Sequence, residues 1–154
     1  MSLTEKILSL FRSGILLSGE WQGVYGYGDG YSELIKKMTV GFVASIETTQ
    51  GRAFKGTIRE DEKGIPEASA VEGRLKGQRI IFTETYERRY EIDLDGTITA
   101  KEGPAYVQYE GRYDKSSDSF SGTWKIERWL TYESGRQVHD VVSGPWKMSR
   151  MKPI

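Results

Sequence analysis

The chain has 154 residues, and its 22 basic and 22 acidic residues give a formal net charge of zero. This length fits one domain that can bury a core without staples, and the charge balance excludes a general nucleic-acid-binding protein, which needs a basic surface. The absence of Cys excludes a disulfide scaffold, a thiolate metal site and a cysteine nucleophile, and the single His excludes a multi-histidine metal cage.

The N-terminal segment lacks the pattern of a targeting peptide. Its longest apolar stretch covers only residues 15–17, and Glu5, Lys6 and Arg12 interrupt the segment, so the apolar region of a signal peptide is missing. No stretch of the chain approaches the ~20 apolar residues of a membrane-spanning helix. We therefore expect a cytoplasmic protein with neither a membrane nor a nucleic acid as partner.

Residues 3–13 have the periodicity of a short amphipathic helix. Apolar side chains recur there at helical spacing, at Leu3, Ile7, Leu10 and Phe11. Ser2 followed by Glu5 resembles a capping box, and Gly14 follows as a stop signal. We expect residues 1–18 to form this helix and its lead-in, with the apolar face of the helix packed on the rest of the domain.

From Gly19 onward the pattern changes to strands separated by turns. Gly is abundant, with 18 residues, and Pro is scarce, with 4. Turn signals recur about every 10–20 residues, and the segments between them alternate in polarity as strands do. The expected strands lie near 20–28, 36–47, 52–60, 67–75, 78–87, 105–113, 119–131 and 137–149, with a further short one near 89–94.

Consecutive antiparallel strands must hide the edges of their sheet. Closure into an up-and-down barrel does so most completely, and no second helix is long enough for the crossover of a parallel sheet. We therefore predict an all-β fold, an antiparallel up-and-down barrel of about eight strands over residues 19–150. The short N-terminal helix precedes this barrel, and residues 151–154 form a tail. A two-sheet sandwich is the alternative.

Strand alternation sorts the side chains into an inner and an outer face. For the strand near 78–87, we choose the face of Ile80, Phe82, Glu84 and Tyr86 as the inner one because it is bulkier. The inner faces of all strands together combine aromatic rings with polar groups. The rings are Phe42, Phe54, Phe82 and Trp124, and the polar side chains are Tyr25, Tyr27, Glu84, Tyr86, Tyr109, Arg128 and Asp140.

These inward polar residues have two interpretations. Buried polar groups must be hydrogen-bonded or paired, so the first is a satisfied network in which Arg128 pairs with Glu84 or Asp140. The second is a wet cavity in which the polar side chains orient a ligand and the four aromatic rings form the walls. The two interpretations are compatible if a ligand completes the network.

Gly19-Glu20-Trp21 opens the first predicted strand, directly after the helical segment and before the meander. A Gly-x-Trp in this place resembles the calycin superfamily, which includes lipocalins, fatty-acid-binding proteins and avidins. Residues 109–113 and 120–124 also resemble barrel strands of lipocalin-like or avidin-like proteins. The resemblance implies a barrel in which Trp21 packs across the closed end, covered by a basic side chain, Arg150 or Lys147.

Avidins bind biotin and nitrobindin-type barrels bind haem. The sequence of residues 19–34 differs from the pattern of both branches. Where avidins begin their biotin site after the first Trp, this chain has Gln22-Gly23-Val24-Tyr25. Residues 19–23 resemble the start of nitrobindin-type haem barrels, but the Tyr-Pro-Thr-Ile that follows there is Tyr31-Ser32-Glu33-Leu34 here. Haem binding requires His139 as axial ligand, whereas alternation places His139 on the outer face. We expect neither a cofactor nor a metal.

The sequence supports three hypotheses about function. The first is a binding protein for a small, largely apolar ligand inside the barrel. The second is a barrel enzyme that uses Glu84 or Asp140 as a general base with a pKa raised by burial. The third is a structural or interaction module that uses exposed aromatic residues such as Trp129, with a homodimer as one form of it. The charged run Glu60-Asp61-Glu62-Lys63 is interpreted as a solvated hairpin tip.

Overall fold

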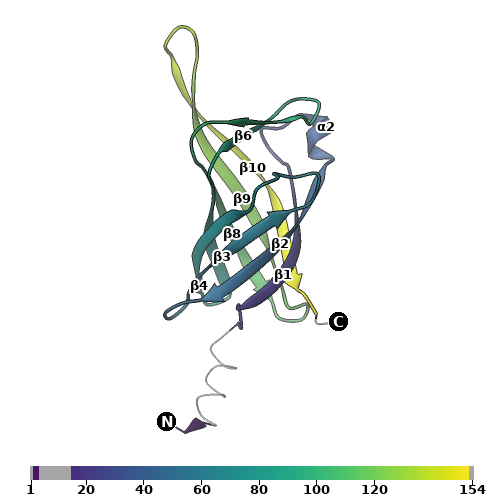
Figure 1. The fold of residues 1–154 in the computed structure, drawn as a ribbon, viewed down its shortest axis with the longest axis vertical. Coiled ribbons are helices and arrows are strands. Elements are labelled where there is room, and N and C mark those ends of the chain that lie inside the picture. The colour runs from purple at the N-terminus through teal and green to yellow at the C-terminus, as the bar shows by residue number, and fades with distance from the viewer. Residues whose placement is uncertain (1, 4–14, 153–154) are drawn as a thin grey trace.

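The structure is a computed structural model that describes residues 2–3 and 15–152, with the backbone alone for residues 128–131. Its main feature is a closed antiparallel barrel (Figure 1). The eight barrel strands are β1 (Gly19–Gly26), β2 (Thr39–Thr48), β3 (Ala53–Glu60), β4 (Ser69–Lys76), β5 (Arg79–Tyr86), β8 (Ala105–Asp114), β9 (Ser119–Thr131) and β10 (Gln137–Arg150). This architecture confirms the predicted all-β barrel; the helix predicted over residues 3–13 lies outside the described residues.

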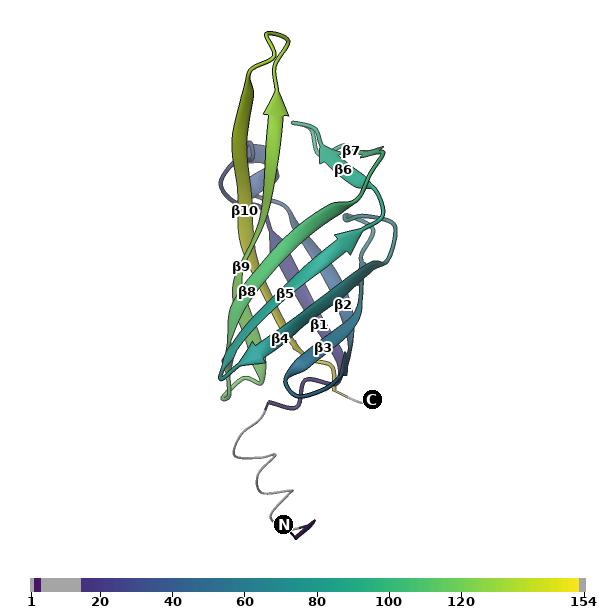
Figure 2. The same ribbon diagram turned by 90° about the vertical axis from the view of Figure 1, so that its left-hand side faces the viewer.

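The barrel strands follow one another around the ring in chain order, and β1 closes the ring against β10. Between β5 and β8 the chain leaves the ring and forms a separate two-stranded sheet, β6 (Arg89–Ile92) and β7 (Ile98–Lys101). The strand predicted near 89–94 is β6, which pairs with β7 rather than with a barrel strand. Figure 2 shows this β6–β7 hairpin at the end of the barrel opposite the C-terminus.

The strand predicted over 36–47 begins later than expected. Glu33–Lys36 form a four-residue helix, α2, and β2 begins at Thr39. The Ser32 hydroxyl caps α2 by accepting a hydrogen bond from the Ile35 N–H at 3.4 Å. Ile35 is buried, and Met38 is half-buried. Nowhere in the described part of the chain is a helix long and apolar enough to cross a membrane.

The end of the barrel next to the C-terminus is closed by side chains. Trp21 is fully buried, and its ring centroid lies 5.3 Å from that of Phe120. The Trp21 Nε1–H donates to the Leu17 carbonyl at 2.8 Å. The Arg150 guanidinium lies 4.4 Å from the centroid of the Trp21 ring. Of the two basic residues that the calycin resemblance suggested as a cover for Trp21, the structure uses Arg150, while Lys147 is exposed.

Aromatic rings fill the middle of the barrel. Phe82 and Tyr109 stack face to face with their centroids 4.5 Å apart. Phe54 and Trp146 approach Phe82 with centroid distances of 6.0 and 5.6 Å. The inner face chosen for the strand near 78–87 is confirmed, because all four of its residues on β5 are at most 5% exposed. Aromatic rings therefore pack the interior from Trp21 up to this layer, which is termed the solid part of the barrel.

Inward-facing glycines make room for the rings and for the close approach of neighbouring strands. Gly122 on β9 lies opposite Gly111 on β8. A Cβ atom added at Gly122 would lie 1.9 Å from the Glu110 carbonyl oxygen. A Cβ atom added at Gly144 on β10 would lie 2.8 Å from the ring of Trp124. These two positions admit no side chain unless the backbone or the Trp124 ring moves.

Replacement of Gly122 by Ala tests this packing constraint. We expect Gly122→Ala to lower the free energy of unfolding by about 3 kcal/mol, because a backbone carbonyl must shift to accommodate the methyl group. The matched control is Gly26→Ala on β1, whose Cβ would meet no atom closer than 3.5 Å. Urea unfolding followed by tryptophan fluorescence measures both, and equal losses for the two variants would contradict the interpretation.

Candidate functional site

The end of the barrel beneath the β6–β7 hairpin contains a cavity of about 90 Å³. Residues of β1, β5, β8 and β9 line it, together with the hairpin and the segments that follow β1 and β3. Its aromatic lining consists of Tyr25, Tyr27, Tyr31, Tyr86, Tyr90, Tyr109 and Trp124. Its aliphatic lining consists of Ile65, Ile92, Ile98, Ala105, Val107 and Ile126. Two carboxylates, those of Glu84 and Glu91, complete the lining.

Trp124 anchors one wall of the cavity. Its Nε1–H donates to the Gly26 carbonyl at 2.9 Å, which satisfies the buried indole. Tyr27 and Tyr31 pack on it with centroid distances of 6.1 Å each, and their own centroids are 4.9 Å apart. The Tyr27 ring meets Trp124 edge to face at 89°, the arrangement that the quadrupoles of aromatic rings favour.

Glu84 is the most buried charged residue of the cavity, with 1% of its side chain exposed. Its carboxylate accepts a hydrogen bond from the Tyr109 hydroxyl at 2.9 Å and another from the Ser69 hydroxyl. Burial is the main reason why the pKa of Glu84 rises to about 7, and the negative charge of Glu60 adds to the rise. At neutral pH this carboxyl group can therefore either accept or release a proton.

Glu60 is a second inward carboxylate, at the end of β3. It accepts hydrogen bonds from the Tyr86 hydroxyl at 2.7 Å and from the Tyr25 hydroxyl. Burial raises the pKa of Glu60 above its ordinary value. The prediction of a solvated hairpin tip was wrong for this residue, because Glu60 continues the inward series of Phe54 and Ile58 along β3.

The direction of these hydrogen bonds determines what the cavity offers a ligand. A tyrosine hydroxyl has one proton to donate, and Tyr25, Tyr86 and Tyr109 each donate it to a carboxylate. Burial and the nearby carboxylates raise the pKa of all three hydroxyls, so they keep their protons at neutral pH. The Tyr25 hydroxyl also has a hydrogen bond with Tyr27, so the oxygen lone pairs of Tyr86 and Tyr109 are the ones left as acceptors.

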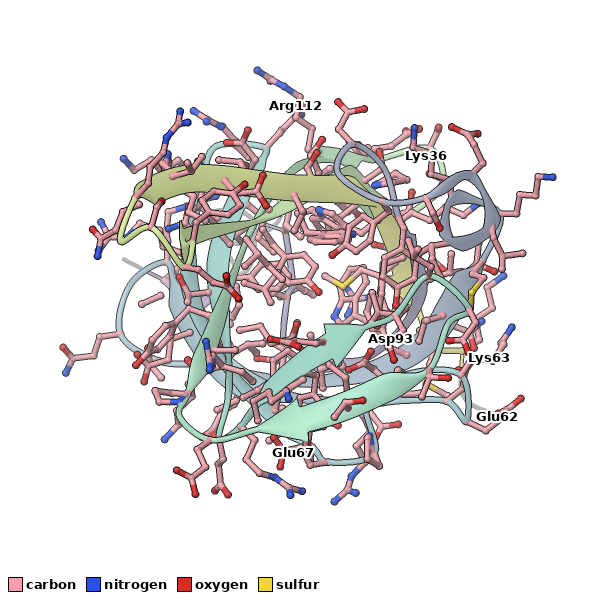
Figure 3. All side chains as sticks on the ribbon, turned by 90° about the horizontal axis from the view of Figure 1, so that it is seen from above. Lys36, Glu62, Lys63, Glu67, Asp93 and Arg112 are labelled. Atoms are coloured by element: carbon pink, nitrogen blue, oxygen red, sulfur yellow. The ribbon has the colours of Figure 1, made fainter. Side chains whose placement is uncertain are left out.

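The β6–β7 hairpin covers the cavity. The Tyr90 ring packs on Tyr86 with a centroid distance of 6.1 Å, and the Tyr90 hydroxyl is buried with no hydrogen-bond partner among the described residues. Near the turn of the hairpin, a Cβ added at Gly96 would meet Met38 at 3.5 Å and Ile35 of α2 at 3.8 Å. Seen from above in Figure 3, the hairpin crosses the barrel end, with Asp93 on the same side as Lys63.

Six of the predicted site residues lie at this cavity, namely Tyr25, Tyr27, Glu84, Tyr86, Tyr109 and Trp124. Phe42, Phe54 and Phe82 are instead buried in the solid part of the barrel and do not line the cavity. Asp140 is half-buried on β10, away from the lining, and faces Arg128 across the β9–β10 register. The side chain of Arg128 lies outside the described part, as does that of Trp129.

Sequence reasoning missed five polar residues of the site, which are Tyr31, Glu60, Ser69, Tyr90 and Glu91. The spacing of Glu60 from Phe54, and of Ser69 from Val71 and Leu75, carried a usable signal, because both continue a buried strand face. Tyr31, Tyr90 and Glu91 had no such signal, since the first lies in a loop and the other two lie in a hairpin outside the barrel.

His139 lies on the outer face of β10, as alternation predicted. Its side chain is 44% exposed, and its Nε2 lies 3.5 Å from the Glu127 carboxylate. Within the described residues, no three His, Asp or Glu side chains gather in a way that could hold a metal ion. The chemistry of the candidate site therefore depends on its carboxyl and hydroxyl groups and its rings.

The chain was compared with protein families, curated proteins and solved structures. No family model, no curated protein and no solved structure matches the chain. The closed antiparallel barrel of eight strands is compatible with a calycin-like fold.

The pKa of Glu84 predicts how stability depends on pH. The ordinary pKa is 4.5 and the folded value is about 7. Between these values the unfolded chain loses the proton while the folded chain keeps it, so the free energy of unfolding falls as pH rises and then levels off. The total loss is about 3 kcal/mol, and Glu60 acts in the same direction.

Urea unfolding between about pH 4.5 and pH 8 measures this dependence. We expect Glu84→Gln to flatten the curve, because the amide does not titrate. Glu47→Gln, at an exposed position on β2, is the matched control and should follow the wild-type curve. A curve for Glu84→Gln as steep as the wild-type one would contradict the assignment.

Proposed function

We propose that this chain is a calycin-like barrel that binds a small, largely apolar ligand in the cavity beneath the β6–β7 hairpin. The observation that carries the proposal is the cavity itself, whose lining is mostly aromatic and aliphatic and includes the buried carboxyl group of Glu84. Ligand sites are typically concave and apolar, with a few polar groups that fix the orientation of the ligand.

The volume of the cavity limits the ligand. An engineered cavity of about 150 Å³ in another protein holds benzene, and a water molecule in the liquid occupies about 30 Å³. The cavity here, at about 90 Å³, is smaller than that benzene site. Without movement of the hairpin it accommodates a compound of roughly four non-hydrogen atoms, so a long-chain fatty acid does not fit.

A second depression suggests how a ligand reaches the cavity. It has a volume of about 550 Å³ and lies between residues 62–66 and the β6–β7 hairpin. Tyr90 and Ile98 line both spaces, so these two side chains separate the cavity from the depression. Since β6 and β7 pair with each other rather than with the ring, the hairpin can tilt without breaking hydrogen bonds of the barrel.

A neutral probe of matching size tests the proposal. We expect 2-propanol to cause saturable shifts of amide NMR signals at residues such as Val107 and Ile126, which line the cavity. Ala105→Leu should abolish these shifts, because the larger side chain fills the cavity from β8. Ala70→Leu, at an exposed position on β4, is the matched control and should preserve them.

Two results would count against cavity binding. One is a wild-type titration that does not saturate, and the other is an unchanged titration with Ala105→Leu. The amide spectrum of each variant also reports whether the barrel is folded, so loss of binding through unfolding is recognised directly.

A further inference from the structure

We infer that the ligand of the cavity carries a protonated amino group, so that the chain binds a small organic ammonium ion. The inference rests on the proposed function and names the chemical class of ligand for the same site. The acidic cluster of this site, defined as Glu60, Glu84 and the hydroxyl groups of Tyr25, Tyr86 and Tyr109, is the feature that would recognise the ammonium group.

The first argument is charge. Both charged residues that line the cavity, Glu84 and Glu91, are acidic, and Glu60 lies behind the hydroxyls of Tyr25 and Tyr86. No Lys, Arg or His is among the described side chains of the lining. A carboxylate buried without a counter-charge is unfavourable, so it either keeps a proton or pairs with a cation. A ligand with an ammonium group supplies that cation.

The second argument is the direction of the hydrogen bonds. Tyr86 and Tyr109 line the cavity and donate their protons to carboxylates, so the acidic cluster offers their lone pairs and the carboxylate oxygens as acceptors. An ammonium group has three N–H donors and no acceptor, which complements such a surface. An alcohol supplies a single donor, and a carboxylate ligand would meet both like charge and unmatched acceptors.

The third argument is the unpartnered hydroxyl of Tyr90. Its oxygen is buried without a hydrogen-bond partner among the described residues, and Tyr90 lines the cavity from the hairpin. Buried polar atoms in native structures nearly always have a partner. An N–H of the ligand would provide one here, while Glu84 on β5 accepts another. The aromatic rings of the lining also attract a cation.

A proton and an ammonium ion compete for the Glu84 carboxylate, so the affinity for an amine should depend on pH. Ser69, Tyr86 and Tyr109 face Glu84 with their hydroxyls, and Glu60 adds a negative charge. Because the pKa of Glu84 is about 7, an ammonium ion must compete with a proton below that pH. Affinity for an amine that stays protonated should therefore rise with pH through this region, whereas affinity for a neutral alcohol should not.

Isopropylamine and 2-propanol form a matched pair of probes, because they differ only in the amino and hydroxyl groups. We expect amide NMR titrations of the full chain at about pH 8 to give a Kd at least about tenfold lower for the amine, since charge-assisted hydrogen bonds are the stronger kind. Glu84→Gln should remove this preference, while Glu47→Gln should keep it. At about pH 5.5 the wild-type preference should shrink.

The other outcomes overturn either the inference alone or both the inference and the proposed function. If both probes saturate with equal Kd, the inference is overturned and the proposed function stands. If neither saturates, both are overturned. A preference for the amine that survives in Glu84→Gln, or that does not change with pH in the wild-type protein, overturns the assignment to the acidic cluster. The pH series needs no variant, so the inference is tested even if Glu84→Gln does not fold.

Discussion

The closed ring of strands imposes the constraint on which the rest of this structure depends. Every second residue of eight strands faces one interior, and that interior must be filled or must hold something else. From Trp21 to the stacked pair of Phe82 and Tyr109, aromatic rings fill it. Above that layer the inward residues combine tyrosines and Glu84 with aliphatic side chains such as Val107 and Ile126, and these leave a cavity rather than a solid core.

The tyrosines connect the two regions. Tyr109 stacks on Phe82 with its ring and donates to Glu84 with its hydroxyl, so the same side chain ends the solid core and begins the polar cluster. Hydroxyl groups donate hydrogen bonds to the carboxylates. Among the described side chains that line the cavity, none is basic. Hydroxyl donors satisfy the oxygen atoms of a carboxylate but do not neutralise its charge, which is why burial raises the pKa of Glu84 and Glu60.

The sequence predicted the barrel well because period-two alternation and turn signals are local properties of each strand. The same rule identified Glu84 and Tyr109 as inward residues. It missed Glu60 because a run of charged residues at a strand end also fits a solvated turn. It also placed Phe42, Phe54 and Phe82 in the ligand site, because alternation gives the face of a residue but not its height along the barrel axis. That height depends on the stagger of neighbouring strands, which only the pairing register reveals.

No local sequence signal predicted the position of the β6–β7 hairpin. This hairpin nevertheless controls access to the cavity, because its residues line it. It closes the cavity with Tyr90, Ile92 and Ile98 while its strands pair with each other. A ligand held between Glu84 on the barrel and the Tyr90 hydroxyl on the hairpin would link the barrel and the hairpin by hydrogen bonds. Binding and closure are then one equilibrium, because the ligand favours the arrangement in which both partners reach it.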